Sequence, residues 1–129
     1  MKARIQRTDV LDIKAEALIY STNVMLNCSG GVGASLVNRY GGQVQEDLHQ
    51  LLDKRGIKHA GRASIFQHVS TGMPYQKVFH TLPCDGFYET SPEIIADILH
   101  RCLSECVATP GINSVALSAL ATGYGHLKY

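Results

Sequence analysis

The stretch EALIYSTNVMLNCSGGVGASLVNRY, residues 16–40, combines a strand-like run, a glycine-rich turn and a helix-like run. The apolar run at residues 16–21 is typical of a strand that is buried on both faces. Three glycines then occupy four positions, 30–33, and residues 34–40 show helical spacing before a Gly-Gly pair. A buried strand that leads through glycines into a helix favours a parallel α/β sheet.

The rest of the chain continues this alternation of strand and helix. Further strands are predicted at residues 3–7, 62–69, 76–82 and 113–120. A second helical stripe starts at Val44 and is predicted to stop at Gly56. We therefore expect one domain, residues 1–129, with a three-layer α/β/α architecture and a mostly parallel, mixed sheet.

The clearest helix is TSPEIIADILHRCLSECVA, residues 90–108. Ser91 is suited to cap its first turn, and Pro92 is suited to its first position. One side of the helix carries apolar residues at helical spacing and is expected to be buried. The predicted buried residues are Ile94, Ile95, Ile98, Leu99, Cys102, Leu103 and Cys106.

Composition limits the possible partners and compartments. The net charge is +1, which gives no indication of a nucleic-acid or membrane surface, and no apolar run is long enough to span a bilayer. The polar N-terminus does not resemble a secretory signal. We expect a cytoplasmic protein that does not bind membranes and acts as a monomer.

Four cysteines occur in the chain, and their spacing matches neither a CxxC pair nor a Cys/His metal motif. We therefore predict no metal site and no cofactor. Cys28 precedes a helix, where a thiol pKa can be lowered, but no paired base is evident in the sequence. A cysteine-based phosphatase loop would also need an arginine at position 34, where the chain has alanine.

Three informative segments follow strands and are expected at the carboxyl edge of the sheet, where α/β proteins bind ligands. They are Asp9, the run from Asn23 to Gly33, and the run from Ala121 to Gly125. A glycine turn at a helix N-terminus offers backbone N–H groups and the positive end of the helix dipole, both of which favour phosphate. The alternative is that the glycines only permit tight turns. Two glycine loops at one edge favour a phosphate.

Four ordered motifs resemble those of the macrodomain family, whose members bind ADP-ribose. RTDVLDIKAEALIYSTN resembles the family's GDIT…DAIVNAAN opening with the same spacing, and GGVGASL resembles its GGGV-x-x-A-I loop. AGRASIFQHVSTGMPYQKVFHTLP resembles GxAxxTxGxxLPxxxVIHxVGP, and VALSALATGYGHL resembles IAxPALGTGxGGL. The resemblance covers nearly the whole chain.

The resemblance implies a role for each matching position. Asp9 is expected to accept a hydrogen bond from the adenine amino group, with the Val10 backbone supporting the same base. Asn23 is expected to face the distal ribose. The remaining positions are expected to enclose the diphosphate and distal ribose from two sides, Gly30, Gly31, Val32 and Gly33 on one and Ala121, Thr122, Gly123, Tyr124 and Gly125 on the other.

Purely structural roles are the alternative for several of these side chains. Asp9 is also a common residue in turns, and Asn23 is suited to satisfy buried backbone at a strand end. Tyr124 is compatible with a surface loop. His80 lies in an apolar strand and is expected to be a hydrogen-bonded core histidine rather than an acid or base.

The chain departs from the family where catalysis is concerned. One hydrolytic branch has an acidic residue after GGGV, where this chain has Gly33. A second has a lysine before its GIA segment, where this chain has Gly30, and Tyr20 replaces the first asparagine of NAAN. The catalytic residues are therefore unknown, with Asn23 a weak candidate.

The resemblance also implies that a helix and a strand normally follow Tyr129. That strand lies in the sheet between the first strand and the strand at 114–118. We expect a C-terminally truncated or incompletely represented domain, or another element in the gap.

Three functions follow from the resemblance. The leading hypothesis is a protein that binds ADP-ribose, either free or on modified macromolecules. The alternative is a hydrolase of ADP-ribosyl bonds or an O-acetyl-ADP-ribose deacetylase that uses a water positioned by the ligand. Single-stranded RNA binding is the least favoured because the charge is nearly neutral.

Overall fold

The computed structural model describes residues 3–85, 87 and 89–120. In this part of the chain a four-stranded sheet has the order β2-β3-β1-β4. β1 pairs in parallel with both β3 and β4, whereas β2 runs antiparallel to β3. The expected mixed, mostly parallel sheet is confirmed. Its strands are β1 (Ala17–Ser21), β2 (Ile65–Gln67), β3 (Lys77–Thr81) and β4 (Val115–Leu117).

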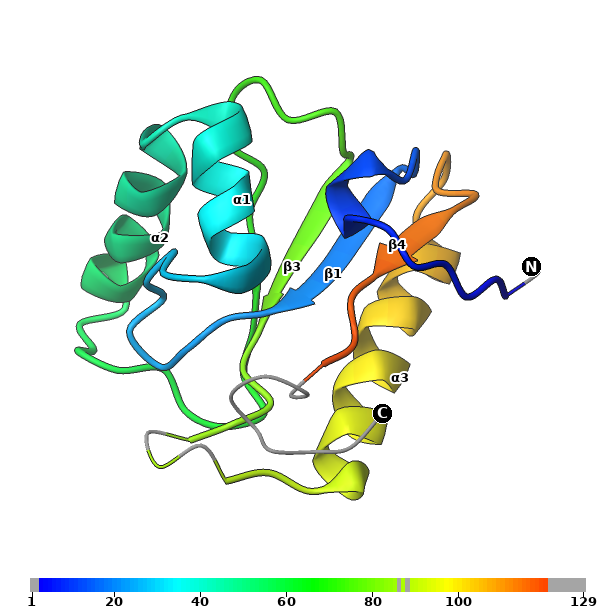
Figure 1. Ribbon diagram of the computed structural model, residues 1–129. Coiled ribbons are helices and arrows are strands. Elements are labelled where there is room, and N and C mark those ends of the chain that lie inside the picture. Colours follow the sequence, from blue (N-terminus) through cyan, green and yellow to red (C-terminus); the bar gives the residue numbers. More distant parts are fainter. Residues whose placement is uncertain (1–2, 86, 88, 121–129) are drawn as a thin grey trace.

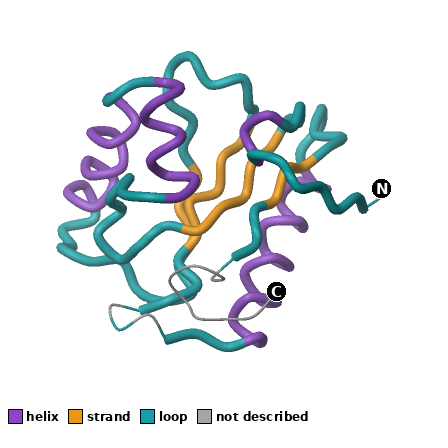
Figure 2. The backbone as a smooth tube through the Cα atoms, in the orientation of Figure 1, coloured by secondary structure: helices purple, strands orange, loops and turns teal. Residues whose placement is uncertain are grey.

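Helices cover both faces of the sheet, which confirms the three-layer α/β/α architecture (Figures 1 and 2). α1 (Gly31–Tyr40) and α2 (Gln43–Lys54) lie on one face, and α3 (Pro92–Ala108) lies on the other. A short 3-10 helix, η1 (Val10–Asp12), packs against α1 and β4.

Strand β1 is buried on both faces because its side chains alternate between two cores. Leu18 and Tyr20 belong to the cluster that includes Leu36 of α1 and Leu48 of α2. Ala17 and Ile19 belong to the other cluster, which is formed mainly with α3. This two-sided burial explains the continuous apolar run at residues 16–21.

The predicted C-terminal ends of α1 and α2 and the predicted start of α3 are observed, whereas α1 begins at Gly31 and not at residue 34. Gly41 ends α1 with a φ of 97°, and Gly56 follows α2 with a φ of 66°. The Ser91 hydroxyl accepts a hydrogen bond from the Ile94 N–H at 3.3 Å, which caps α3. The prediction that Leu103 of α3 is buried is wrong, because this residue is 37% exposed. It lies one residue past buried Cys102, and a step of about 100° around the helix places it at the rim of the stripe.

The strand expected at residues 3–7 is not formed. These residues are exposed and belong to no sheet, and Ile5 is fully solvent-accessible. Within the described residues β4 is an edge strand, and its outer side carries no neighbour. Residues 3–7 do not pair with this open side, so the alternating pattern alone does not produce a strand here.

The fold brings the loops of interest to one edge. Because β1, β3 and β4 are parallel, the segments that leave Ser21, Thr81 and Leu117 start at the same end of the sheet. They gather at the lower edge in Figure 1. The backbone links two of them directly, since the Thr22 N–H donates to the Thr81 carbonyl at 2.8 Å.

Candidate ligand-binding site

The glycine turn after β1 leads directly into α1. Gly30 and Gly31 have φ values of 82° and 56°, in the left-handed region that favours glycine. No side chain caps the first turn of α1, and N–H groups at a helix start have no partner within the helix. The turn therefore presents backbone donors and the positive end of a helix dipole, as an anionic group requires.

Gly33 is buried where α1 packs on the preceding loop. A Cβ atom at this position would lie 3.2 Å from the Cα atom of Cys28. The contacted atom belongs to the backbone, so a side chain at residue 33 would require the loop to move. Gly33 thus supplies close packing between the helix and the loop, and it supplies no group that activates water.

Asn23 organises the loop that follows β1. Its Oδ1 atom accepts hydrogen bonds from the N–H groups of Met25 at 3.2 Å and Asn27 at 3.0 Å. Its Nδ2 atom donates to the Asn27 carbonyl at 2.9 Å. A side-chain amide has two N–H hydrogens, so one remains for a ligand.

Helix α2 holds the same loop from the side. The Gln45 Oε1 atom accepts from the Cys28 N–H at 2.6 Å, and its Nε2 atom donates to the Leu26 carbonyl at 2.8 Å. One turn further, the His49 Nε2 atom lies 3.0 Å from the Asn27 Oδ1 atom. Sequence reasoning missed both residues. Their only signal was the four-residue spacing that places them on one face of a helix.

Cys28 is half-buried beneath the turn, and burial raises the pKa of its thiol. The thiol is therefore neutral near pH 7, whereas a nucleophilic cysteine needs the thiolate. The location of Cys28 before a helix does not lower its pKa here. Cys28 packs against Gly33, and its backbone N–H donates a hydrogen bond to the Gln45 side chain.

Asp9 and Val10 lie at the start of η1. The Asp9 carboxylate accepts from the Leu11 N–H at 2.9 Å, is 43% exposed and lies 3.8 Å from the Arg39 guanidinium. Val10 is buried. Arg39 belongs to the last turn of α1, whereas the glycine turn begins that helix. Because α1 begins at the carboxyl edge and runs back over the sheet, Asp9 lies near the opposite end of the helix, about 15 Å from the glycine turn for ten helical residues. The expectation that Asp9 lies at the carboxyl edge is therefore wrong, and only an extended ligand reaches both.

Tyr20 and His80 form a buried pair beneath the site. The Tyr20 hydroxyl is hydrogen-bonded to the His80 Nδ1 atom, and the His80 Nε2 atom lies 3.0 Å from the His68 carbonyl. Burial lowers the pKa of His80 to about 4 and raises that of Tyr20. Both side chains are fully paired and neutral near pH 7, which confirms His80 as a core histidine.

Some predictions for the site lie outside what the structure describes. Residues 121–125, the second glycine loop, are not among the described residues. Within the described part, no three His, Cys, Asp or Glu side chains are grouped as a metal ion would require. In the same part, every helix is too short or too polar to cross a bilayer.

Comparison with known proteins agrees with this geometry. The family model described as Macro domain matches residues 19–129. A curated relative from Cronobacter sakazakii, named O-acetyl-ADP-ribose deacetylase, is 26% identical over 130 residues, which cover 98% of this chain and 71% of the relative.

Two solved structures illustrate the similarity of fold. The Oceanobacillus iheyensis macrodomain with MES bound superposes with a TM-score of 0.78 at 14% identity, covering 94% of this chain and 65% of that structure. The Trypanosoma brucei macrodomain in complex with ADP-ribose gives a TM-score of 0.69 at 20% identity, covering 92% and 47%. The chain thus spans 65% and 47% of the lengths of these two structures.

Proposed function

Because this chain belongs to the macro domain family, we propose that it binds ADP-ribose, free or attached to a macromolecule, at the carboxyl edge of its sheet. The observation that carries the proposal is the uncapped glycine turn at the start of α1. Its backbone donors and helix dipole suit a diphosphate. Two proteins of the same fold carry the ligand in their descriptions, one with ADPR and one in complex with ADP-ribose.

The proposal places the ligand alongside α1, from the glycine turn at the carboxyl edge toward Asp9 near the other end of the helix. Gly30, Gly31, Val32 and Gly33 hold the diphosphate, and the free Nδ2 hydrogen of Asn23 faces the distal ribose. The adenine amino group lies at the Asp9 carboxylate, with the Val10 backbone beside it. The glycine run from Ala121 to Gly125 closes over the phosphates. An extended ligand with adenine at one end suits the separation of Asp9 from the glycine turn.

Binding without catalysis fits the local chemistry best. Gly33 has no side chain, the Cys28 thiol is held neutral by burial, and the oxygen of the Asn23 amide is already bonded to its own loop. A general base has to lie within hydrogen-bond reach of the water it activates. None of these three residues supplies one.

A hydrolase is the second candidate, and the curated relative favours it because that protein is named O-acetyl-ADP-ribose deacetylase. The reaction would then depend on a water held by the bound diphosphate. Release of acetate from O-acetyl-ADP-ribose, measured against a buffer blank, separates the two candidates. A rate well above the blank that is lost in Asn23→Ala would replace the binding proposal with the hydrolase.

Isothermal titration calorimetry with ADP-ribose, ADP and AMP tests the proposal. We expect ADP-ribose to bind more tightly than ADP, and ADP more tightly than AMP, because each added group reaches another part of the proposed site. A folded sample that gives no heat of binding with ADP-ribose would contradict the proposal. Equal affinity for ADP-ribose and ADP would remove the distal ribose from the site.

The proposed setting is the cytoplasm, with the protein acting as a monomer. The four cysteines are free thiols, as in reducing compartments. RNA is not proposed as the ligand, since a net charge of +1 supplies few phosphate contacts.

A further inference from the structure

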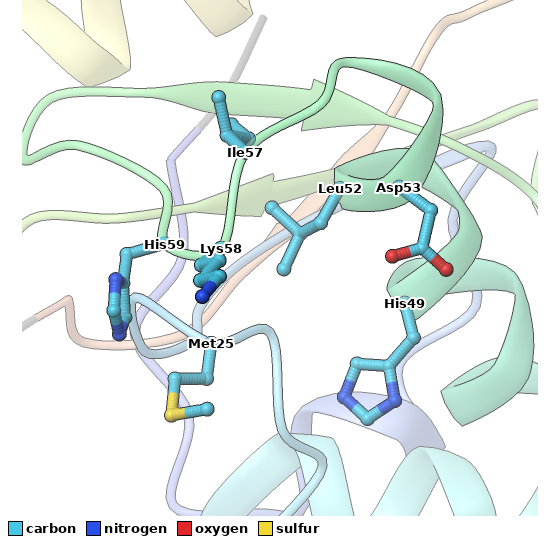
Figure 3. Close-up of a pocket in the computed structure, with 7 residues that line it drawn as sticks. All are labelled: Met25, His49, Leu52, Asp53, Ile57, Lys58 and His59. Atoms are coloured by element: carbon cyan, nitrogen blue, oxygen red, sulfur yellow. The ribbon is translucent and has the colours of Figure 1, made fainter.

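A pocket of about 480 Å³ lies beside the glycine loop, and we call it the α2 pocket. His49, Leu52 and Asp53 of α2 line one side, and the segment that carries Lys58 and His59 lines the other (Figure 3). Met25, from the loop after β1, and Ile57 complete it.

The lining of the α2 pocket combines buried and exposed apolar groups. Leu52 is buried, whereas Met25 is 47% exposed and Ile57 is 39% exposed. Large apolar side chains that gather in a hollow and remain open to solvent are typical of binding surfaces.

The α2 pocket and the proposed ADP-ribose site share one loop. The Met25 N–H donates to the Asn23 side chain, whose amide the proposed function places at the distal ribose. On the pocket side, His49 lies 3.0 Å from the Asn27 side chain, one residue before Cys28. A group attached to the distal ribose therefore leaves the site next to this pocket.

The size of the pocket suits an attached group larger than an acetyl ester. Ligand pockets in proteins typically enclose about 300–1,000 Å³, and this one lies in that range. An acetyl ester has three heavy atoms beyond the ribose oxygen and would leave most of the space empty. A polypeptide segment with an aliphatic side chain fills it.

The charges at the rim favour a polypeptide over a nucleic acid. Asp53, Lys58 and His59 are exposed, and none of them makes a side-chain hydrogen bond or ion pair with another described residue. A nucleic-acid backbone is uniformly anionic and needs several Lys or Arg side chains. One lysine opposite one aspartate suits a segment that carries charges of both signs.

We propose that the α2 pocket holds the polypeptide segment next to an ADP-ribosylated side chain, with an aliphatic side chain of the target against Leu52, Met25 and Ile57. The inference rests on the proposed function, because an ADP-ribosyl group is attached to its target through the distal ribose. The protein then recognises part of the modified polypeptide as well as the nucleotide.

The test compares two ligands by calorimetry, free ADP-ribose and a short synthetic peptide that carries ADP-ribose on a serine beside a leucine. Wild-type protein should bind the peptide more tightly than free ADP-ribose. Ile57→Asp should weaken the peptide about tenfold and leave free ADP-ribose unchanged. Val107→Asp is the matched control, because Val107 is 79% exposed on α3, and it should change neither affinity.

Met25→Ser is a second variant, and it should also weaken binding of the peptide while leaving the affinity for free ADP-ribose unchanged. Peptide binding that is insensitive to both variants would overturn the inference while leaving the proposed function intact. A wild-type protein that binds neither ligand would remove both. An ADP-ribosylated oligonucleotide that loses affinity in Ile57→Asp, when the peptide does not, would assign the pocket to nucleic acid instead.

Discussion

Cys28, Gly33 and Asn23 show how little side-chain chemistry the glycine loop offers. Gly33 packs on the Cys28 backbone, and three hydrogen bonds tie the Asn23 amide into its own loop. These residues shape the turn, so the groups they leave for a ligand are backbone N–H donors and a single amide hydrogen. These groups suit the binding of a ligand and not catalysis.

The Cys28 thiol should react slowly with alkylating reagents. Burial raises its pKa, so less thiolate is present near pH 7 than in a free cysteine. Iodoacetamide labelling followed by mass spectrometry should give a lower rate than for glutathione, and the rate should rise with pH. Cys28→Ser should bind ADP-ribose as well as the parent. Loss of a measured hydrolytic activity in this variant, with affinity intact, would identify Cys28 as reactive.

Asp9→Ala should weaken ADP-ribose binding by about 1–3 kcal/mol, through loss of a charge-assisted hydrogen bond to the adenine amino group. Asp12→Ala is the matched control, because both carboxylates lie near Arg39 and Asp12 is the closer, at 2.8 Å. Calorimetry on both variants should show the loss for Asp9 alone. Equal losses would mean that the Arg39 ion pairs, and not adenine recognition, are responsible.

Helix α2 contributes to the site although none of its residues was predicted there. Gln45 bonds both the Cys28 N–H and the Leu26 carbonyl, so it pairs with the loop much as a neighbouring strand would. Leu26 has a φ of 52° and is fully buried, an uncommon conformation for a large side chain. The helix therefore holds the loop in a shape that its own sequence does not favour.

Gln45→Leu should reduce ADP-ribose affinity and also stability, because two backbone groups of the loop lose their partner, at about 1–3 kcal/mol for each buried group. Calorimetry gives the affinity and urea unfolding gives the stability. Gln50→Leu, at an exposed position of the same helix, is the matched control. A destabilised variant with unchanged affinity would show that the loop does not need Gln45 for binding.

The stability of the whole molecule depends on pH through a pair of polar side chains in its core. Tyr20 and His80 are buried in adjacent strands and bond to each other. Histidine titrates at about 6.5 in an unfolded chain, and burial lowers the pKa of His80 to about 4. Between these pH values the unfolded chain binds a proton that the folded chain does not. Stability therefore falls as the pH drops from about 6.5 to 4.

His80→Gln should remove this part of the pH dependence. Urea unfolding of the parent at pH 7 and pH 5 should differ by about 2 kcal/mol more than that of the variant, since 1.36 kcal/mol corresponds to one pKa unit. The variant should also be less stable at pH 7, because glutamine fills the buried site less well. Identical pH dependence for the two proteins would show that the pKa of His80 is the same in the folded and the unfolded chain.

Local sequence patterns predicted much of the architecture. The buried run at β1, Ser91 before α3 and Gly56 after α2 each have a short-range physical cause, and each was predicted. The strand at residues 3–7 was not formed, because pairing depends on a neighbour that a local pattern does not reveal. Gln45 and His49 were missed for the same reason, since their partners lie 17 to 22 residues away in the chain.

In the proposed function, the glycine turn at the start of α1 holds the diphosphate of ADP-ribose. Calorimetric titration of Gly31→Glu with ADP-ribose tests this role of the turn, with Gly72→Glu as the matched control. Both glycines have positive φ, 56° and 93°, and a Cβ atom at either meets nothing within 4 Å, so both substitutions add the same charge without a clash. The backbone strain is the greater at Gly72, whose φ lies outside the left-handed α-helical region, so strain alone would harm the control more. We expect Gly72→Glu to bind as the parent does and Gly31→Glu to lose at least about a hundredfold in affinity. A Gly31→Glu protein that binds ADP-ribose as tightly as the parent would show that the diphosphate does not lie at this turn.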